Sequence, residues 1–279
     1  MSFKQAICIT LKLVSCLFFL ASPLVLAEES KTVKVFFLGG QSNMLGKGGE
    51  TKELPPYYQL PHSKIKIWVA KTKKWKPLAP EGRSFGPEIS FGHAMAKAFP
   101  NDDIRLVKYA ANGTALYNDW APTQGAQYVS FMRTMRGALN NLRSKNTEVE
   151  VAGMLWLQGE SDAQEMKGGE YKKNLLAFIK HMRLEFYNWK MPFVIARVRN
   201  FYGRGIQAQM VREAQVEVAN ETEYVAWFDT DDSGKLIKGG HYTSDGLIKI
   251  GKNFSAKYIY MINTAKKDNC EDAFRHCDG

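Results

Sequence analysis

Apolar residues along the chain fall into short continuous runs separated by longer stretches in which they recur every three or four positions. The continuous runs are rich in β-branched and aromatic residues and predict buried strands, whereas the spaced stretches predict helices with one buried face. Strands that alternate with helices pair in parallel, and the helices then cover both faces of the sheet. The pattern therefore predicts an α/β fold, a three-layer α/β/α sandwich around a five-stranded parallel sheet. The five predicted strands are residues 33–38, 104–110, 149–157, 193–198 and 224–228, and the helical stripes begin at Phe91, Tyr128, Tyr171, Ile206 and Leu247.

Residues 46–86 interrupt this alternation. Ile65, Ile67 and Val69 alternate with polar residues, and a lysine-rich segment with Trp75 follows them. This pattern is typical of a hairpin, and we expect it to lie on the surface as an excursion from one domain that spans residues 28–279.

The first 27 residues are typical of a secretory signal peptide. Lys4 and Lys12 supply positive charge, residues 13–20 are largely apolar, and Val25-Leu26-Ala27 offers a cleavage site with small residues. We expect residues 1–27 to be removed and the mature protein to be secreted or periplasmic. Cys16 also ends a segment that resembles a lipoprotein attachment box, but the apolar residues after it disfavour that reading. The apolar stretch is too short to favour stable insertion in a membrane.

Composition narrows the remaining possibilities. A chain of 279 residues with 45 % hydrophobic residues can bury a large core. Its formal net charge of +10 falls to +8 without Lys4 and Lys12, but the basic residues are scattered and accompany no nucleic-acid motif, so we expect no nucleic-acid partner. Two cysteines remain after the signal, Cys270 and Cys277, and they either close a small disulfide loop or stay as free thiols.

Candidate chemistry follows the predicted strands, because ligands of open parallel sheets bind beyond the carboxyl ends of the strands. Ser42 lies in a glycine turn after the first strand, Asn112-Gly113 follows the second, and Gln158 follows the third. The amides of Ser42 and Gly113 and the side chain of Gln158 are three donors suited to an oxyanion hole. Each has an ordinary structural alternative, namely a helix cap, a turn glycine and a buried polar group. Their recurrence at successive strand ends favours a site.

A serine nucleophile needs a base, because its hydroxyl reacts poorly at neutral pH. His241 precedes the last predicted helix and is the histidine best placed to meet Ser42. Its structural alternative is a loop histidine bonded to backbone. The other four histidines lie in predicted helices, in the excursion or in the tail: His62, His93, His181 and His276.

Together these segments resemble the SGNH hydrolase superfamily, specifically its carbohydrate-acetylesterase branch of sialate O-acetylesterase-like and acetylxylan esterase-like proteins (carbohydrate esterase family 6 type). The resemblance implies a flavodoxin-like SGNH hydrolase fold and a secreted esterase that acts on an acetylated carbohydrate. It implies that Ser42 attacks the acetyl group, that His241 transfers the proton, and that no metal or organic cofactor is required. The matching segments are residues 40–44, 85–88, 112–114, 156–161 and 211–215.

One departure concerns the acid of the catalytic triad. The branch commonly carries an aspartate three residues before the histidine, where this chain has Lys238, and a lysine cannot accept the imidazole N–H. Glu160 is our first substitute, although a structural hydrogen bond that holds the Ser42 turn explains it equally well. Other candidates are Asp231, Asp232 and Asp245. The departure also motivates a second hypothesis, a glycan-binding member of the fold with impaired catalysis.

Two further residues are candidates for contacting the substrate. Asn112 replaces the first glycine of its block and would alter the floor of the pocket. Trp120 lies a few residues further on, where an aromatic ring either stacks on a sugar or packs at the rim of the site.

Overall fold

The computed structural model describes residues 32–145, 147–200, 205–237 and 239–275, with side chains up to Ala265. The predicted signal peptide, Lys238 and Cys277 lie outside the described residues, as does the side chain of Cys270.

The core of the fold is a seven-stranded sheet with the order β3-β2-β4-β1-β5-β6-β7. Every neighbouring pair is parallel except β2 and β3 at one edge, which are antiparallel. The five predicted strands correspond to β1, β4, β5, β6 and β7, so the α/β class and the parallel sheet are confirmed. The strands are β1 (Val33–Gly40), β2 (His62–Val69), β3 (Lys74–Leu78), β4 (Asp103–Ala110), β5 (Val149–Leu157), β6 (Phe193–Arg197) and β7 (Val225–Asp229).

The predicted strand count was wrong, because the hairpin is part of the sheet. Residues Ile65 to Ile67 of β2 pair in parallel with β4, and β3 then forms the edge. A surface hairpin would leave one side of β2 in solvent. Instead β2 has a buried side chain on each face of the sheet, since Ile65 belongs to one hydrophobic core and Trp68 to the other.

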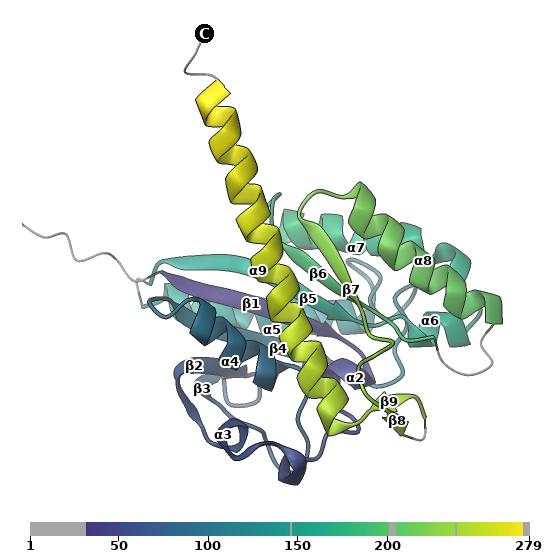
Figure 1. The fold of residues 1–279 in the computed structure, drawn as a ribbon, viewed down its shortest axis with the longest axis horizontal. Helices are drawn as coiled ribbons and strands as arrows, with labels where there is room; N and C mark the ends of the chain where they lie inside the picture. Colours follow the sequence, from purple (N-terminus) through teal and green to yellow (C-terminus); the bar gives the residue numbers. More distant parts are fainter. Residues whose placement is uncertain (1–31, 146, 201–204, 238, 276–279) are drawn as a thin grey trace, which may run out of the picture. The chain divides into compact units, whose positions relative to one another are not determined.

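Helices cover both faces of the sheet (Figure 1). The helices α4 (Glu88–Ala98) and α9 (Ser244–Arg275) pack on one face, and α5 (Ala126–Arg143), α7 (Tyr171–Glu185) and α8 (Gly205–Glu221) pack on the other. No helix in the described ranges is long and apolar enough to cross a membrane. Shorter elements connect these layers: α2 (Ser42–Leu45), the 3-10 turn Thr51–Glu53, α3 (Pro56–Gln59), α6 (Glu160–Gln164), the 3-10 turn Gly168–Glu170, β8 (Leu236–Ile237) and β9 (His241–Tyr242).

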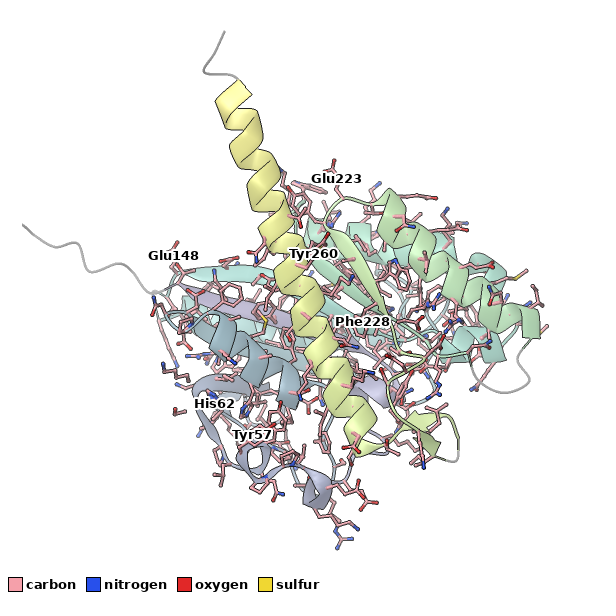
Figure 2. All side chains as sticks on the ribbon, viewed as in Figure 1. Tyr57, His62, Glu148, Glu223, Phe228 and Tyr260 are labelled. Atoms are coloured by element: carbon pink, nitrogen blue, oxygen red, sulfur yellow. The ribbon has the colours of Figure 1, made fainter. Side chains whose placement is uncertain are left out.

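Two hydrophobic cores hold these layers together. On the α9 face, Phe36 of β1 makes edge contacts with Phe91 and Tyr258. Phe228 of β7 lies against α9 in the same core (Figure 2) and meets Phe254 edge-on at 4.9 Å. Burial on both sides of β1 fixes it in the middle of the sheet.

The central position of β1 brings three strand ends together. The parallel register sets Gly40 opposite Ala110 of β4 and opposite Leu157 of β5. The segments that follow these three residues therefore begin at one edge of the sheet, as we expected.

Candidate active site

The turn after β1 presents Ser42 at the edge of the sheet. Gly40 adopts φ +150°, and a Cβ there would lie 2.1 Å from the carbonyl oxygen of Leu157. Only glycine permits this close approach. Gln41 extends the contact with β5, because its N–H donates to the carbonyl of Leu157 at 3.1 Å. Ser42 is then the first residue of α2, so its own N–H has no acceptor within the helix.

His241 contacts the Ser42 hydroxyl. The distance from Nε2 to Ser42 Oγ is 3.1 Å, although 199 residues separate the two. His241 is half-buried on β9, directly after a turn in which Gly239 and Gly240 both have positive φ. A base within hydrogen-bond reach of a hydroxyl is the arrangement that activates a serine nucleophile. The structure thus brings together the two residues that the sequence singled out as nucleophile and base.

Asn43 joins the nucleophile turn to two other segments. Its Nδ2 donates to Glu160 Oε1 at 2.7 Å, and its Oδ1 accepts from the backbone N–H of Tyr242 at 3.3 Å. Asn43 is buried, so both bonds are shielded from water. Sequence reasoning missed this role, although Asn43 belongs to the same block as Ser42. Asn43 fixes the backbone next to His241 relative to the backbone next to Ser42.

The carboxylate of Glu160 contacts Asn43 rather than His241. Its second oxygen, Oε2, is buried and has no hydrogen-bond partner in the described part of the chain. Burial raises the pKa of this carboxyl, and the hydrogen bond from Asn43 opposes that shift. The direct contact with the imidazole that we expected is therefore not formed. The alternative interpretation, a structural hydrogen bond that holds the Ser42 turn, matches the geometry.

The other candidate acids have different surroundings. Burial alone would raise the pKa of Asp231, but hydrogen bonds from Arg212 at 2.7 and 2.9 Å lower it overall. A hydrogen bond from Lys249 lowers the pKa of Asp232. Asp245 is exposed in the first turn of α9. Asp231 and Asp232 are thus engaged by cations.

Gly113 is exposed in the segment that begins beside the nucleophile turn. Ala111 donates its N–H to the carbonyl of Gly40, so the segment after β4 begins next to the segment after β1. Gly113 is exposed with φ +61°, and a Cβ there would meet no atom within 4 Å. Asn112 is exposed next to it. The roles of oxyanion donor for Gly113 and substrate contact for Asn112 stay predictions.

Gln158 does not have the role that we expected. Its side chain is fully buried, and Nε2 donates to the carbonyl of Thr114 at 3.0 Å and to Asp162 Oδ2 at 2.6 Å. An amide nitrogen carries only two hydrogens, so none remains for an oxyanion. The prediction of Gln158 as an oxyanion donor was wrong. Instead, the side chain ties the end of β5 to the segment that contains Gly113.

The structure also contradicts the predicted substrate contact of Trp120. This side chain is fully buried, its indole N–H donates to Thr114 Oγ1 at 2.9 Å, and its ring packs edge-on against Trp156. A ring enclosed in this way cannot stack on a sugar. The segment after Gly113 turns into the core, where Trp120 packs instead of lining the site.

Asp162 is a second residue that sequence reasoning missed. It is fully buried and accepts the backbone N–H groups of Leu116 at 2.8 Å and Tyr117 at 3.1 Å, besides the bond from Gln158. Burial raises its pKa to about 6, although these hydrogen bonds favour the charged form. Asp162 therefore anchors the segment that carries Gly113 to the turn after β5.

Other features of the described chain lie away from this site. Its histidines, cysteines and acids form no group of three or more that could hold a metal ion.

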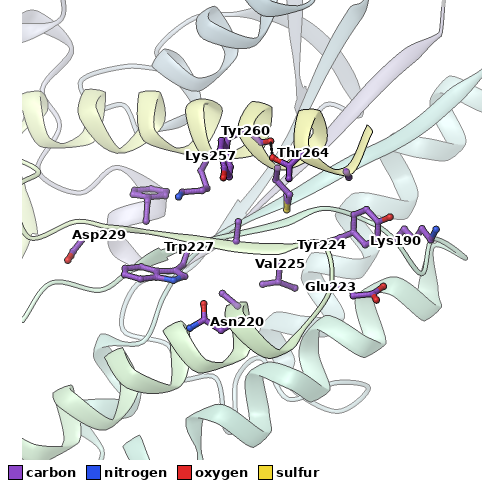
Figure 3. Close-up of a pocket in the computed structure, with 15 residues that line it drawn as sticks. Lys190, Asn220, Glu223, Tyr224, Val225, Trp227, Asp229, Lys257, Tyr260 and Thr264 are labelled. Atoms are coloured by element: carbon purple, nitrogen blue, oxygen red, sulfur yellow. Dashed lines mark hydrogen bonds between the residues drawn. The ribbon is translucent and has the colours of Figure 1, made fainter. Parts of the chain in front are cut away.

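A cavity of about 900 Å³ lies along β7 between α8 and α9 (Figure 3). Trp227 of β7, Asn220 of α8 and Lys257 of α9 line it, and no candidate catalytic residue does.

Comparison with known families agrees with this geometry. The family model described as carbohydrate esterase, sialic acid-specific acetylesterase, matches residues 32–260. The chain belongs to this family. A probable carbohydrate esterase of Arabidopsis thaliana is 26 % identical in an alignment of 251 residues, which covers 81 % of this chain and 90 % of that protein. The predicted resemblance to the carbohydrate-acetylesterase branch is confirmed.

Solved structures support the fold of this carbohydrate esterase family member. The X-ray structure of an Arabidopsis thaliana protein superposes with a TM-score of 0.68 at 23 % identity, covering 81 % of this chain and 98 % of that one. A carbohydrate acetylesterase from Xanthomonas citri has a TM-score of 0.61 at 18 % identity, covering 79 % of this chain and 55 % of that one. These likenesses establish a shared architecture.

Proposed function

We propose that the protein is a secreted serine esterase that removes acetyl groups from an acetylated carbohydrate. The observation that carries this proposal is the 3.1 Å contact between Ser42 Oγ and His241 Nε2 at the carboxyl edge of the sheet. Family membership supports the ester and carbohydrate parts of the proposal. The printed names of the Arabidopsis and Xanthomonas proteins, a probable carbohydrate esterase and a carbohydrate acetylesterase, agree with it.

The proposed reaction has two steps. His241 Nε2 accepts the hydroxyl proton while Ser42 Oγ attacks the acetyl carbonyl, and the N–H groups of Ser42 and Gly113 bind the developing oxyanion. The sugar oxygen leaves with the proton from His241, and the acetyl group stays on Ser42. Water then loses a proton to His241 and attacks the acetyl carbonyl. The bond between the acetyl carbon and Ser42 Oγ breaks, His241 returns its proton to Ser42 Oγ, and the acetic acid that leaves ionises to acetate.

The orientation of His241 in this mechanism depends partly on its backbone. Asn43 accepts the N–H of Tyr242, the next residue, and is itself held by Glu160. We propose that Glu160 acts as a positioning residue through Asn43. Glu160→Gln should then lower kcat with little change in KM.

Acetate release tests the proposal. The purified protein would be assayed on acetylated xylan, acetylated sialic acid and a chromogenic acetyl ester. Ser42→Ala should abolish release, whereas Ser63→Ala, at an exposed serine of β2, should leave it unchanged. Equal rates for wild type and Ser42→Ala would refute Ser42 as the nucleophile.

Lys238 supports a second candidate, a glycan-binding protein that no longer hydrolyses acetyl esters. A lysine occupies the position where the branch commonly carries the aspartate that orients the histidine. Binding of an acetylated glycan with no acetate release from any substrate would favour this function. Acetate release that depends on Ser42 would exclude it.

The proposed export has a separate test. If residues 1–27 are a signal peptide, the N-terminus of the protein recovered from a secreting host should be Glu28. Recovery of the intact N-terminus would contradict export by this route.

A further inference from the structure

A cleft distinct from the cavity along β7 lies at the amino-terminal ends of the parallel strands, whereas Ser42 follows the carboxyl end of β1. It has a volume of about 560 Å³ and is bordered by Val33 and Asp103, at the first residues of β1 and β4. The strand from Val33 to Gly40 spans roughly 23 Å at about 3.3 Å per residue. A ligand in this cleft is therefore separate from the acetyl group that Ser42 would attack. We call it the basic cleft, because five cations line it: Lys66, Lys73, Lys74, Arg105 and Lys145.

The lining of the basic cleft is strongly positive. Among the described residues that line it, Asp103 is the one acid, and Arg105 binds that carboxylate with both terminal nitrogens. Five cations and one acid give a formal charge of +4 (5 − 1). The carboxyl end of α5 contributes roughly half a negative charge, which the cations outweigh. The four lysines form no ion pair with any described acid, so their charge remains available to a ligand.

Polar groups in the cleft wall are also left unsatisfied. Trp75 Nε1, Arg105 Nε and Asn141 Oδ1 are buried and have no hydrogen-bond partner among the described residues. Buried polar atoms without partners destabilise a folded protein. Neighbouring atoms cover all three, so a ligand in the cleft would contact the exposed lysines and not these groups.

We propose that the basic cleft binds an acidic polysaccharide through the carboxylates of its sugars. A flat anionic membrane would not enter a concave cleft. Binding of a single nucleic-acid strand commonly relies on free aromatic faces. The Trp75 ring is already engaged, because its centroid lies 5.2 Å from that of Trp68 and 5.8 Å from the Arg105 guanidinium carbon. Carboxylated sugars use the available charge of the lysines without needing a free ring.

If Ser42 acts as the proposed esterase nucleophile, the basic cleft would assist the reaction on polymers, because one long chain can reach both sites. A chain held at the basic cleft stays near the protein while Ser42 acts on an acetyl group elsewhere along it, which raises the effective substrate concentration. The KM for an acidic polymer should therefore depend on the cleft, whereas the kcat and KM for a small neutral acetyl ester should not.

Binding to polygalacturonate, measured by calorimetry in the Ser42→Ala background, tests this proposal independently of hydrolysis. Lys73→Glu/Lys74→Glu should weaken binding by about tenfold or more. The control Lys180→Glu/Lys252→Glu makes the same change in net charge at exposed lysines that do not line the cleft, and should change affinity by less than about threefold.

Three results would overturn the proposal. The first is equal loss of affinity in the cleft variant and the control, which would indicate attraction by net charge alone. The second is binding of a thymidylate oligonucleotide as tight as that of polygalacturonate. The third is no binding by the wild type at low salt. If circular dichroism shows that the lysine double variant is unfolded, Lys66→Gln/Lys145→Gln tests the same cleft from its other side.

Discussion

The titration of Asp162 should make the stability of the protein depend on pH in a direction opposite to that of most carboxylates. Asp162 is fully buried, and its pKa is raised from 3.8 to about 6. The folded state thus holds a proton that the unfolded state has released at the same pH. Stability must fall as pH rises from about 4 through about 6.

The size of this effect follows from the pKa shift. A difference of 6 − 3.8, about 2 units, corresponds to about 3 kcal/mol at about 1.4 kcal/mol per unit. Asp162→Asn removes the titrating group and keeps one acceptor oxygen, so it loses either the bond from Leu116 or the bond from Tyr117, which donate to different oxygens; that loss is the same at every pH. The free energy of unfolding of the variant should therefore rise relative to that of the wild type by about 2 kcal/mol between pH 4 and pH 7.5, because part of the full change lies below pH 4.

Urea unfolding of both proteins at several pH values measures this change. The difference between variant and wild type isolates Asp162, because the other titrating groups are common to both. Asp232→Asn provides a control of opposite sign, since Lys249 lowers the pKa of Asp232 and its charge stabilises the fold as pH rises. Parallel pH dependences for wild type and Asp162→Asn would refute the argument from burial.

Three further substitutions test the framework of the site. Asn43→Ala removes two buried hydrogen bonds and should cost about 2–4 kcal/mol in urea unfolding while lowering kcat at least about tenfold; wild-type kcat would contradict the bridging role. Trp120→Phe should lower thermal stability, because the fully buried ring loses volume and its bond to Thr114, but should leave KM unchanged; a raised KM would instead indicate sugar contact. Gly40→Ala places a methyl 2.1 Å from the carbonyl oxygen of Leu157 and should abolish acetate release, whereas an active, equally stable variant would show that the turn tolerates a side chain.

The sequence was sufficient to predict the parallel sheet and the meeting of Ser42 with His241. Continuous apolar runs mark strands buried on both faces, and parallel pairing requires the strand ends to share an edge. The hairpin was misjudged because the half-polar pattern of β2 is the same for a surface strand and for a strand near the sheet edge. Local pattern alone does not distinguish these two cases.

The roles of individual polar side chains were less predictable. Gln158 lies at the expected strand end, but its direction depends on Asp162, four residues later in α6. Glu160 points to Asn43 and not to His241, because the Asn43 amide from another segment donates to its carboxylate. Sequence spacing places such residues near a site, whereas tertiary hydrogen bonds decide which atoms face the substrate.

The bridging position of Asn43 delays formation of the active site to a late stage of folding. Asn43 bonds to segments 117 and 199 residues away, so the nucleophile turn, the Glu160 turn and the His241 loop take their final positions only after the chain from β1 to β9 has folded. Contacts between such distant segments form slowly. Recovery of esterase activity during refolding should therefore follow the last tertiary step rather than the return of helical structure. A fragment that ends before β9 would lack the site altogether.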